Sequence, residues 1–348
     1  MASKFLGGLI ISERFFHEVG EPIITSVFPN LKYSAGLIGP GSEVLGFDTE
    51  VSTDHDWRPR FFVFLTDKAL LKYGKKLEQR LRESLPKEYE GYLTHSKNTK
   101  DLRGRYVYSI SSFLEEYLGV SVKKRISVSD WLTFDEHRLL GVTSGNVFRD
   151  DGRMLEMTRE KIGYYPNDVW LYLLASQWAK ISEEEAFIGR TGEVGDELGS
   201  RLIAARIVQS LMRLCFLMEK KYSPYSKWFG SAFSRLSSGK DLGDTLHQVL
   251  NSSDWKQRET ALSKAHERVL DIYNQLNITE RINATPHNYH ERPYLVIGAD
   301  EISNVIRGKI QDKSLKKLSL IGSVNQFLDS TPLLENDRLR PKLRSLYQ

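Results

Sequence analysis

The feature that most constrains the fold is a change of pattern near residue 120. Before it, short apolar runs that suit strands alternate with segments of helical spacing; beyond it, helical spacing prevails. A chain of 348 residues also exceeds the usual size of one domain. We therefore expect an α+β protein with a small mixed sheet and helices over residues 1–120, followed by a mainly helical domain over residues 121–348.

The expected elements follow from this pattern. The apolar run at 61–65 is typical of a strand covered on both faces. In the first part we expect strands at 33–38, 60–65, 89–94 and 106–110 and helices at 12–28, 68–85 and 111–117. In the second part we expect helices at 169–180, 195–221, 228–236, 242–250 and 254–275 and one late strand at 294–297, with a turn between short strands at 145–152.

Composition excludes some classes of protein. The formal net charge of +4, from 49 basic and 45 acidic residues, is too close to balance to predict a nucleic-acid partner. The single cysteine, Cys215, lies in an apolar helical run where we expect burial, and the absence of a second cysteine indicates a reducing, cytoplasmic location. No run approaches the roughly 20 apolar residues that cross a bilayer, and the N-terminus lacks the pattern of a signal peptide.

A glycine-serine turn follows the first expected strand. It consists of Gly39, Pro40, Gly41 and Ser42. Glycine lets backbone amides approach a ligand without an intervening side chain, and Ser42 at a helix start would add a hydroxyl and further amides. These groups suit phosphate oxygens, although a turn of this kind alone is weak support for a site.

A pair of aspartates, Asp54 and Asp56, precedes the strand expected at 60–65. In extended backbone, residues two apart point to the same side, so both carboxylates would converge on one point. Two hard oxygen ligands suit Mg²⁺ (or Mn²⁺), which neutralises and orients phosphates in phosphoryl-type transfer. An Asp-x-Asp alone is often only a solvated strand end, and the combination with the glycine-serine turn is what favours a nucleotide-and-metal site.

The combination resembles the signature of the DNA polymerase beta-like nucleotidyltransferase superfamily, in which a glycine-serine pair precedes an aspartate pair. That resemblance covers the first third of the chain. It implies transfer of a nucleoside monophosphate from a nucleoside triphosphate such as ATP, with Gly41 and Ser42 at the phosphates and Asp54 and Asp56 at Mg²⁺. Most of the chain also resembles a bacterial family described as domain of unknown function 4037, through residues 39–48, 52–57, 164–170, 195–200 and 224–228.

One departure from the superfamily pattern concerns a third carboxylate. The resemblance implies an acid on a later strand of the same sheet, and the strand expected at 106–110 has none. Glu90, on the other expected strand, and Asp101, in the loop before Tyr106, are the nearby acids. The departure leaves open a relocated base or a protein that binds nucleotide without turnover.

The expected helical domain adds four candidate residues. Asp196 and Glu197 begin a helix, where their charges suit the helix dipole, and the resemblance to antibiotic-modifying nucleotidyltransferases makes them candidates for the base. Tyr225 and Lys227 lie in a short segment rich in lysine and aromatic residues that can stack a base and hold a phosphate. The alternatives are a plain helix N-terminus and a packed helix corner with solvated lysines.

These observations predict a reaction class rather than a particular substrate. We expect a Mg²⁺-dependent nucleotidyltransferase that attacks the α-phosphorus with an acceptor hydroxyl and releases pyrophosphate. A small-molecule acceptor is favoured over tRNA because tRNA binding usually demands strong phosphate neutralisation. The rivals are a regulatory nucleotide-binding protein on the same scaffold and an enzyme that acts on protein or tRNA.

Overall fold

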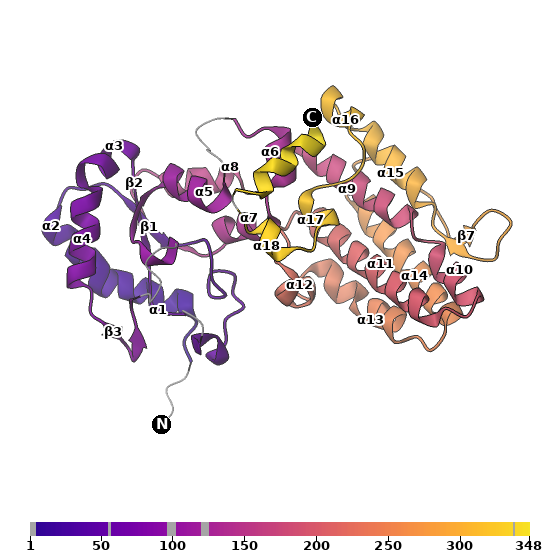
Figure 1. The fold of residues 1–348 in the computed structure, drawn as a ribbon, viewed down its shortest axis with the longest axis horizontal. Coiled ribbons are helices and arrows are strands. Elements are labelled where there is room, and N and C mark those ends of the chain that lie inside the picture. The colour runs from indigo at the N-terminus through magenta and orange to yellow at the C-terminus, as the bar shows by residue number, and fades with distance from the viewer. Residues whose placement is uncertain (1–4, 55–56, 96–101, 120–124, 337) are drawn as a thin grey trace. The chain divides into compact units, whose positions relative to one another are not determined.

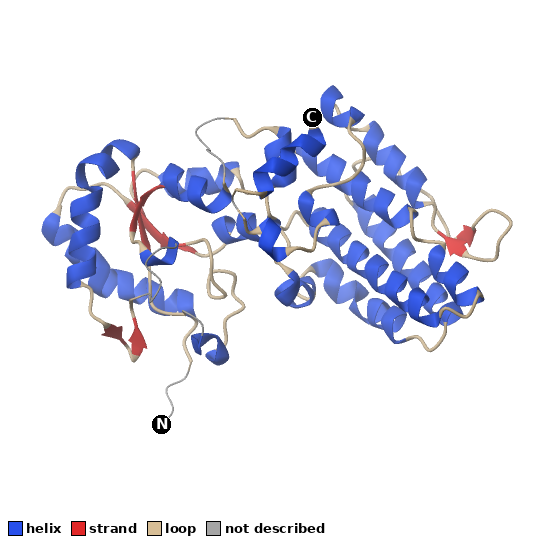
Figure 2. Cartoon of the chain, viewed as in Figure 1, coloured by secondary structure: helices blue, strands red, loops and turns tan. Residues whose placement is uncertain are grey.

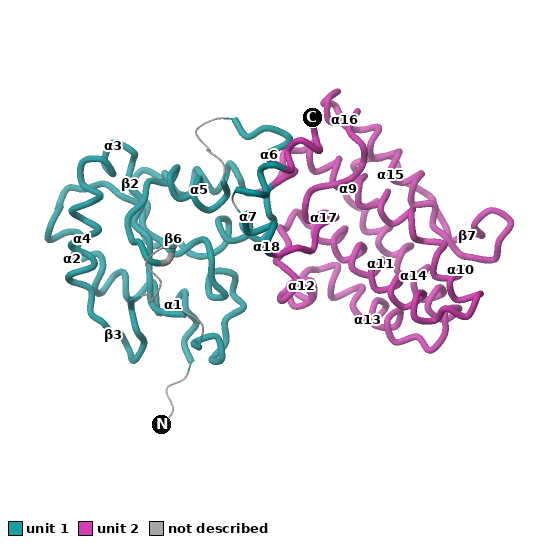
Figure 3. The backbone as a smooth tube through the Cα atoms, viewed as in Figure 1, with its two compact units in different colours: residues 1–130, 134–163, 332–342 teal, residues 131–133, 164–331, 343–348 magenta. Residues whose placement is uncertain are grey.

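The computed structural model describes residues 5–54, 57–95, 102–119, 125–336 and 338–348 (Figure 1). The chain divides into two units, unit 1 with residues 1–130, 134–163 and 332–342 and unit 2 with residues 131–133, 164–331 and 343–348 (Figure 3). Unit 1 holds a small sheet with helices, and unit 2 is mainly helical (Figure 2), so the expected α+β class is confirmed. Unit 1 extends beyond residue 120 because a later strand completes its sheet.

Unit 1 is built on a four-stranded sheet of order β5-β2-β1-β6. Strand β2 runs antiparallel to β1 and parallel to β5, and β6 runs antiparallel to β1 on its other side. The strands are β1 (Ser34–Leu37), β2 (Phe62–Leu65), β5 (Val107–Ser109) and β6 (Asn146–Asp150), with a separate hairpin of β3 (Glu88–Tyr89) and β4 (Tyr92–Leu93). The helices are α1 (Gly8–Phe15), α2 (Glu21–Val27), α3 (Asp67–Ala69), α4 (Lys75–Ser84), α5 (Ile110–Leu118), α7 (Glu136–Thr143) and α8 (Met154–Lys161), while α6 (Val128–Thr133) and α18 (Thr331–Leu334) each continue into unit 2.

Short helical turns of other types complete the unit. π-helical turns at Phe16–Gly20 and Leu70–Gly74 join α1 to α2 and α3 to α4, so each pair forms one longer helix. 3₁₀ helices lie at Glu50–Asp54 and Leu102–Gly104. The helix expected at 12–28 is confirmed and starts earlier, at Gly8.

Two expectations for this sheet were wrong. The segment 89–94 is not a strand of the main sheet, because a turn at Glu90 and Gly91, both with positive φ, folds it into the small hairpin. Residues 146–150, expected within a turn, form the edge strand β6. Asp150 ends that strand and accepts hydrogen bonds from the backbone N–H groups of Leu155 and Glu156, which gives it a structural role at the start of α8.

Strand β2 is buried on both faces, as the apolar run predicts. Val63 and Leu65 belong to a core that includes Phe15 and Phe16 of the first helix. The rings of Phe62 and Phe64 lie on the alternate positions and each sits 5.3 Å from the ring of Phe113 on α5. The sheet therefore packs between two sets of helices. The loops that join its strands begin and end at residues of this packed sheet.

Unit 2 is a group of packed helices with one small hairpin. Helix α9 packs against α11 and α15, and α14 packs against α11 and α13. Within the described residues, no helix is both long enough and apolar enough to cross a membrane. The elements are α9 (Asn167–Ser182), α10 (Phe187–Glu193), α11 (Glu197–Met218), α12 (Ser226–Phe233), α13 (Ser237–Asn251), α14 (Trp255–Gln275), β7 (His287–Asn288), β8 (Leu295–Val296), α15 (Ala299–Gly308), α16 (Lys313–Lys317) and α17 (Val324–Phe327), followed by a 3₁₀ helix at Arg340–Tyr347 that continues from unit 1.

Helix α9 lies at the centre of this group. Every residue from Val169 to Trp178 is buried, which is typical of a helix surrounded by other helices. Cys215 on α11 is fully buried, and burial raises the pKa of its thiol to about 12. The expectation of a structural rather than reactive cysteine is therefore confirmed.

Two buried titratable side chains on α14 give unit 2 opposing pH dependences. Burial lowers the pKa of His266 from 6.5 to about 4, so the unfolded chain binds a proton that the folded chain excludes and stability falls as the pH drops through this range. Burial raises the pKa of Glu259 from 4.5 to about 7, so stability falls as the pH rises through that range.

Replacing Glu259 by glutamine removes the second dependence and leaves the first. Between about pH 4.5 and about pH 6.5, the thermal midpoint of unit 2 is expected to rise with pH more steeply in Glu259→Gln than in the unsubstituted protein. Calorimetry at several pH values measures it. The double variant with His266→Gln is the control and should show neither slope; equal slopes in Glu259→Gln and the unsubstituted protein would contradict the expectation.

Candidate functional site

The glycine-serine turn lies at one end of the sheet in unit 1. It follows β1 directly, and because β2 is antiparallel to β1, the loop that leads into β2 returns to the same end. The Gly39 N–H donates to the Gly141 carbonyl at 2.8 Å, and the Phe47 N–H donates to the Ser42 carbonyl at 2.9 Å. Ser42 therefore begins a hydrogen-bonded turn and not a helix, which corrects the expectation of a helix start at this position.

A buried ion pair contacts this turn and stabilises it. The side chains of Glu43 and Arg60 are each 3% exposed, and Arg60 Nη2 lies 2.7 Å from Glu43 Oε1. Arg60 also donates from Nε to the same carboxylate oxygen and from Nη2 to the Pro40 carbonyl. The pair thus ties the turn to the residues that lead into β2.

The ion pair also explains one of the glycines. Gly41 has φ +140°, and a Cβ at this position would lie 2.4 Å from Glu43 Oε1. A side chain at residue 41 would therefore collide with the carboxylate and strain the backbone. Glycine is required here by internal packing, whether or not a ligand approaches its amide.

Asp54 does not lie in extended backbone as expected. Asp54 is exposed and ends the 3₁₀ helix Glu50–Asp54, so the period-two argument for converging carboxylates does not apply to it. Asp56 lies outside the described residues. Within those residues there is no group of three or more His, Cys, Asp or Glu side chains that could hold a metal ion.

A further acid in this loop was missed by the sequence argument. Asp48 Oδ2 accepts hydrogen bonds from the Gly8 N–H at 2.7 Å and from Trp57 Nε1 at 3.0 Å. It therefore fastens the start of α1 and the residue after the aspartate pair to one point. The only signal in the sequence was the position of this acid between the glycine-serine turn and the aspartate pair.

The strand that should carry the third carboxylate has none. Strand β5 reads Val107, Tyr108 and Ser109, as the sequence indicated. At the start of this strand, Glu78 of α4 accepts from the N–H groups of Tyr106 and Val107, each at 2.9 Å, and pairs with Arg82 at 2.6 Å. Glu78 thus accepts hydrogen bonds from the backbone of the edge strand β5. Asp101 lies outside the described residues.

Asp196 and Glu197 have structural partners in unit 2. Asp196 caps α11 by accepting from the Gly199 N–H at 2.8 Å. Glu197 lies 2.5 Å from Arg258 and 2.9 Å from Arg201, and the hydrogen bond from Arg258 lowers the pKa of its carboxyl. A carboxylate held ionised by two arginines is poorly suited to accept a proton near neutral pH.

Tyr225 and Lys227 also belong to unit 2. Tyr225 is half-buried and its ring meets that of Trp228 edge-on at 5.0 Å, immediately before α12. Lys227 is exposed, with Nζ 5.2 Å from the Trp228 ring. The residues form a small aromatic corner with one exposed cation. This arrangement is compatible both with nucleotide binding and with a packed helix corner whose lysine is solvated.

Comparison with known proteins gives a match in the middle of the chain. Residues 131–229 match the model of a family described as Domain of unknown function (DUF4037). This confirms the resemblance over these residues, which include the motifs at 164–170, 195–200 and 224–228. The turn at Gly39–Ser42 and the aspartate pair lie outside the matched segment.

Among solved structures, the chain is similar to the crystal structure of a nucleotidyltransferase-like protein from Exiguobacterium sibiricum 255-15. The two are 12% identical, the alignment covers 80% of this chain and 83% of that chain, and the TM-score is 0.34. No curated protein matches the sequence.

Proposed function

We propose that this protein is a metal-dependent nucleotidyltransferase. The observation that supports the proposal is the loop between the antiparallel strands β1 and β2, which begins with the glycine-serine turn and carries Asp54 in a short 3₁₀ helix further along. The sequence resemblance to the nucleotidyltransferase superfamily rests on these residues together with Asp56. The acceptor is proposed to be a hydroxyl compound, with a small molecule favoured by the near-balanced net charge of +4.

In the proposed reaction, an acceptor oxygen forms a bond to the α-phosphorus of a nucleoside triphosphate. The bond from that phosphorus to the bridging oxygen breaks, pyrophosphate leaves with the electron pair, and the hydroxyl proton passes to solvent. The backbone amide of Gly41 and the Ser42 hydroxyl would hold phosphate oxygens. The sequence candidates Lys227 and Tyr225 have the chemistry for a charge contact and for base stacking.

The donor chemistry of the loop fits Mg²⁺ or Mn²⁺. Asp54 is an exposed carboxylate, and with Asp56 it would provide the hard oxygen ligands that such ions prefer. When bound, the ion would neutralise charge on the phosphates. The chain's own contribution is to hold this loop in place, through the Glu43–Arg60 pair and the Asp48 hydrogen bonds.

The structure favours one rival of another class. Strand β5 has no acid, and Glu197 forms an ion pair with Arg258, so neither supplies a general base for the reaction. A protein that binds nucleotide and regulates another process, without turnover, would need no base.

We also propose a cytoplasmic location, since the single cysteine leaves no disulfide within the chain.

The test is incubation of the full chain with each labelled nucleoside triphosphate, Mg²⁺ or Mn²⁺, and a cell extract as the source of acceptors. Label transfer with pyrophosphate release, lost in the Asp54→Ala/Asp56→Ala double variant, is expected. Tight nucleotide binding without turnover would support the regulatory rival. Failure to bind any nucleotide would overturn both.

A further inference from the structure

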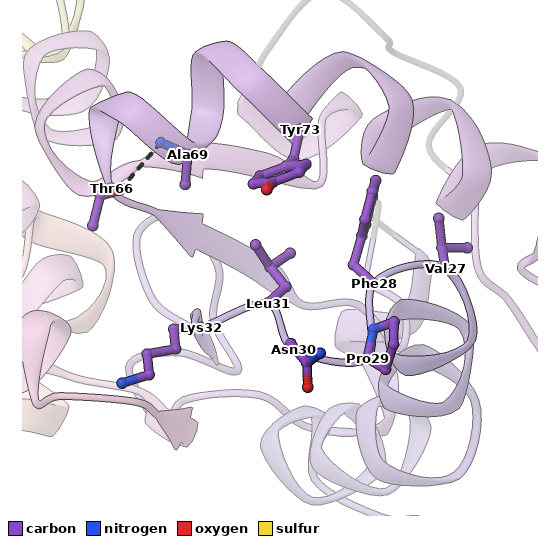
Figure 4. Close-up of a pocket in the computed structure, with 9 residues that line it drawn as sticks. All are labelled: Val27, Phe28, Pro29, Asn30, Leu31, Lys32, Thr66, Ala69 and Tyr73. Atoms are coloured by element: carbon purple, nitrogen blue, oxygen red, sulfur yellow. Dashed lines mark hydrogen bonds between the residues drawn. The ribbon is translucent and has the colours of Figure 1, made fainter.

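A cavity lies in unit 1 at the other end of β1 from the glycine-serine turn. It has a volume of about 420 Å³ and is formed by the loop after α2 and by the start of the α3–α4 helix. Figure 4 shows the side chains of Leu31, from the loop, and Tyr73, from the helix, pointing toward one another across it. The cavity is thus separate from the proposed reaction site.

Two aromatic rings border this cavity and are flanked by cations. The rings of Phe28 and Tyr73 lie 5.1 Å apart at 59°. Lys72 Nζ lies 4.9 Å from the Tyr73 ring, and Lys76 Nζ lies 5.5 Å from the Phe28 ring. Lys32 lines the cavity from the loop side.

The cations form a row rather than a single point. Tyr73, Lys76 and Arg80 are spaced by three and four residues and share one face of the helix. At a rise of about 1.5 Å per residue, the row from Lys72 to Arg80 extends about 12 Å. That length exceeds one phosphate group, so the row suits an extended polyanion. We name Phe28, Lys32, Lys72, Tyr73, Lys76 and Arg80 the lysine–aromatic patch.

The charges of the patch are open to a ligand. Lys32, Lys72, Lys76 and Arg80 are exposed, and in the described part of the chain no carboxylate forms an ion pair with them. Asp151 acts on Lys32 only at longer range, and its carboxylate is paired with Arg149 at 3.0 Å. The net charge of +4 for the whole chain conceals this local excess of positive charge.

We infer that the lysine–aromatic patch binds single-stranded nucleic acid. Stacking of bases on exposed rings, with lysine and arginine along the backbone, is how proteins hold single strands without reading sequence. The half-buried rings of Phe28 and Tyr73 beside the cavity provide the stacking surface, and the row of cations provides the phosphate contacts. The inference goes beyond the proposed transferase activity and does not rest on it.

The experiment measures fluorescence anisotropy of labelled uridine and thymidine oligonucleotides about twelve nucleotides long with the full chain. Binding should weaken with salt, and the double variant Lys72→Ala/Lys76→Ala should bind at least about tenfold more weakly at low salt, with a salt slope smaller by about 1.4. Tyr73→Ala should weaken binding about fivefold or more, whereas Tyr73→Phe should retain it.

The matched control is Lys240→Ala/Lys264→Ala, which removes two exposed lysines from α13 and α14 of unit 2. It should bind within about twofold of the unsubstituted protein. The inference is overturned if the protein does not bind the oligonucleotides, if both double variants lose affinity equally, or if uridine monophosphate or anionic lipid vesicles compete as well as the oligonucleotide. Retained binding by Asp54→Ala/Asp56→Ala separates this result from the transferase proposal.

Discussion

Replacing Arg60 by methionine is expected to lower the free energy of unfolding of unit 1 by about 3–5 kcal/mol. The substitution removes the guanidinium that pairs with Glu43, whose side chain is 3% exposed, and it also removes the hydrogen bond to the Pro40 carbonyl. A buried charge without its partner is strongly destabilising, because the cost of desolvation is no longer offset. The loop that holds the glycine-serine turn should loosen first.

Hydrogen exchange in peptides that contain β1 and β2 measures this effect in unit 1 separately from unit 2. The double variant Glu43→Leu/Arg60→Met should recover most of the loss, because an apolar pair in place of a buried ion pair is often neutral. Arg153→Met, which breaks two exposed ion pairs of the same unit, should leave the exchange unchanged. Equal protection in Arg60→Met and Arg153→Met would show that the buried pair does not stabilise the loop.

The elements that local pattern defines were predictable. The consecutive apolar residues of β2 and the helical spacing of the first helix reflect which faces are covered, and both were confirmed. Strand β6 was not predicted, because the mixed polar and apolar sequence from Asn146 to Asp150 is stabilised as a strand by pairing with the distant β1. Pairing between segments more than a hundred residues apart leaves little trace in either one.

The candidate site shows the same limit. The position of the turn after β1 followed from strand and turn chemistry, whereas the Glu43–Arg60 pair beneath it joins residues seventeen apart through the tertiary fold. The roles of Glu197 and Asp48 depend on partners, Arg258 and Trp57, that no local pattern identifies. Asp54 was expected in extended backbone because it precedes a strand, but the chain forms a 3₁₀ helix before it reaches β2.

Changing Asp54 to asparagine is expected to lower the rate of nucleotidyl transfer by at least about 10²-fold. Asparagine keeps the size of the side chain and removes the charge that would hold the metal ion, so the effect should appear in kcat and in the metal concentration needed for half-maximal rate. Because Asp54 is exposed, the thermal midpoint should not change.

Glu50 offers a matched control within the same short helix. It is also an exposed acid of the 3₁₀ helix Glu50–Asp54, and Glu50→Gln removes the same charge four residues away. A general effect of negative charge in this loop would slow both variants alike, and that outcome would count against a metal-binding role for Asp54. Loss confined to Asp54→Asn, with Glu50→Gln within about twofold of the unsubstituted rate, is what direct metal coordination predicts, because coordination depends on the placement of one carboxylate and not on the charge of the loop.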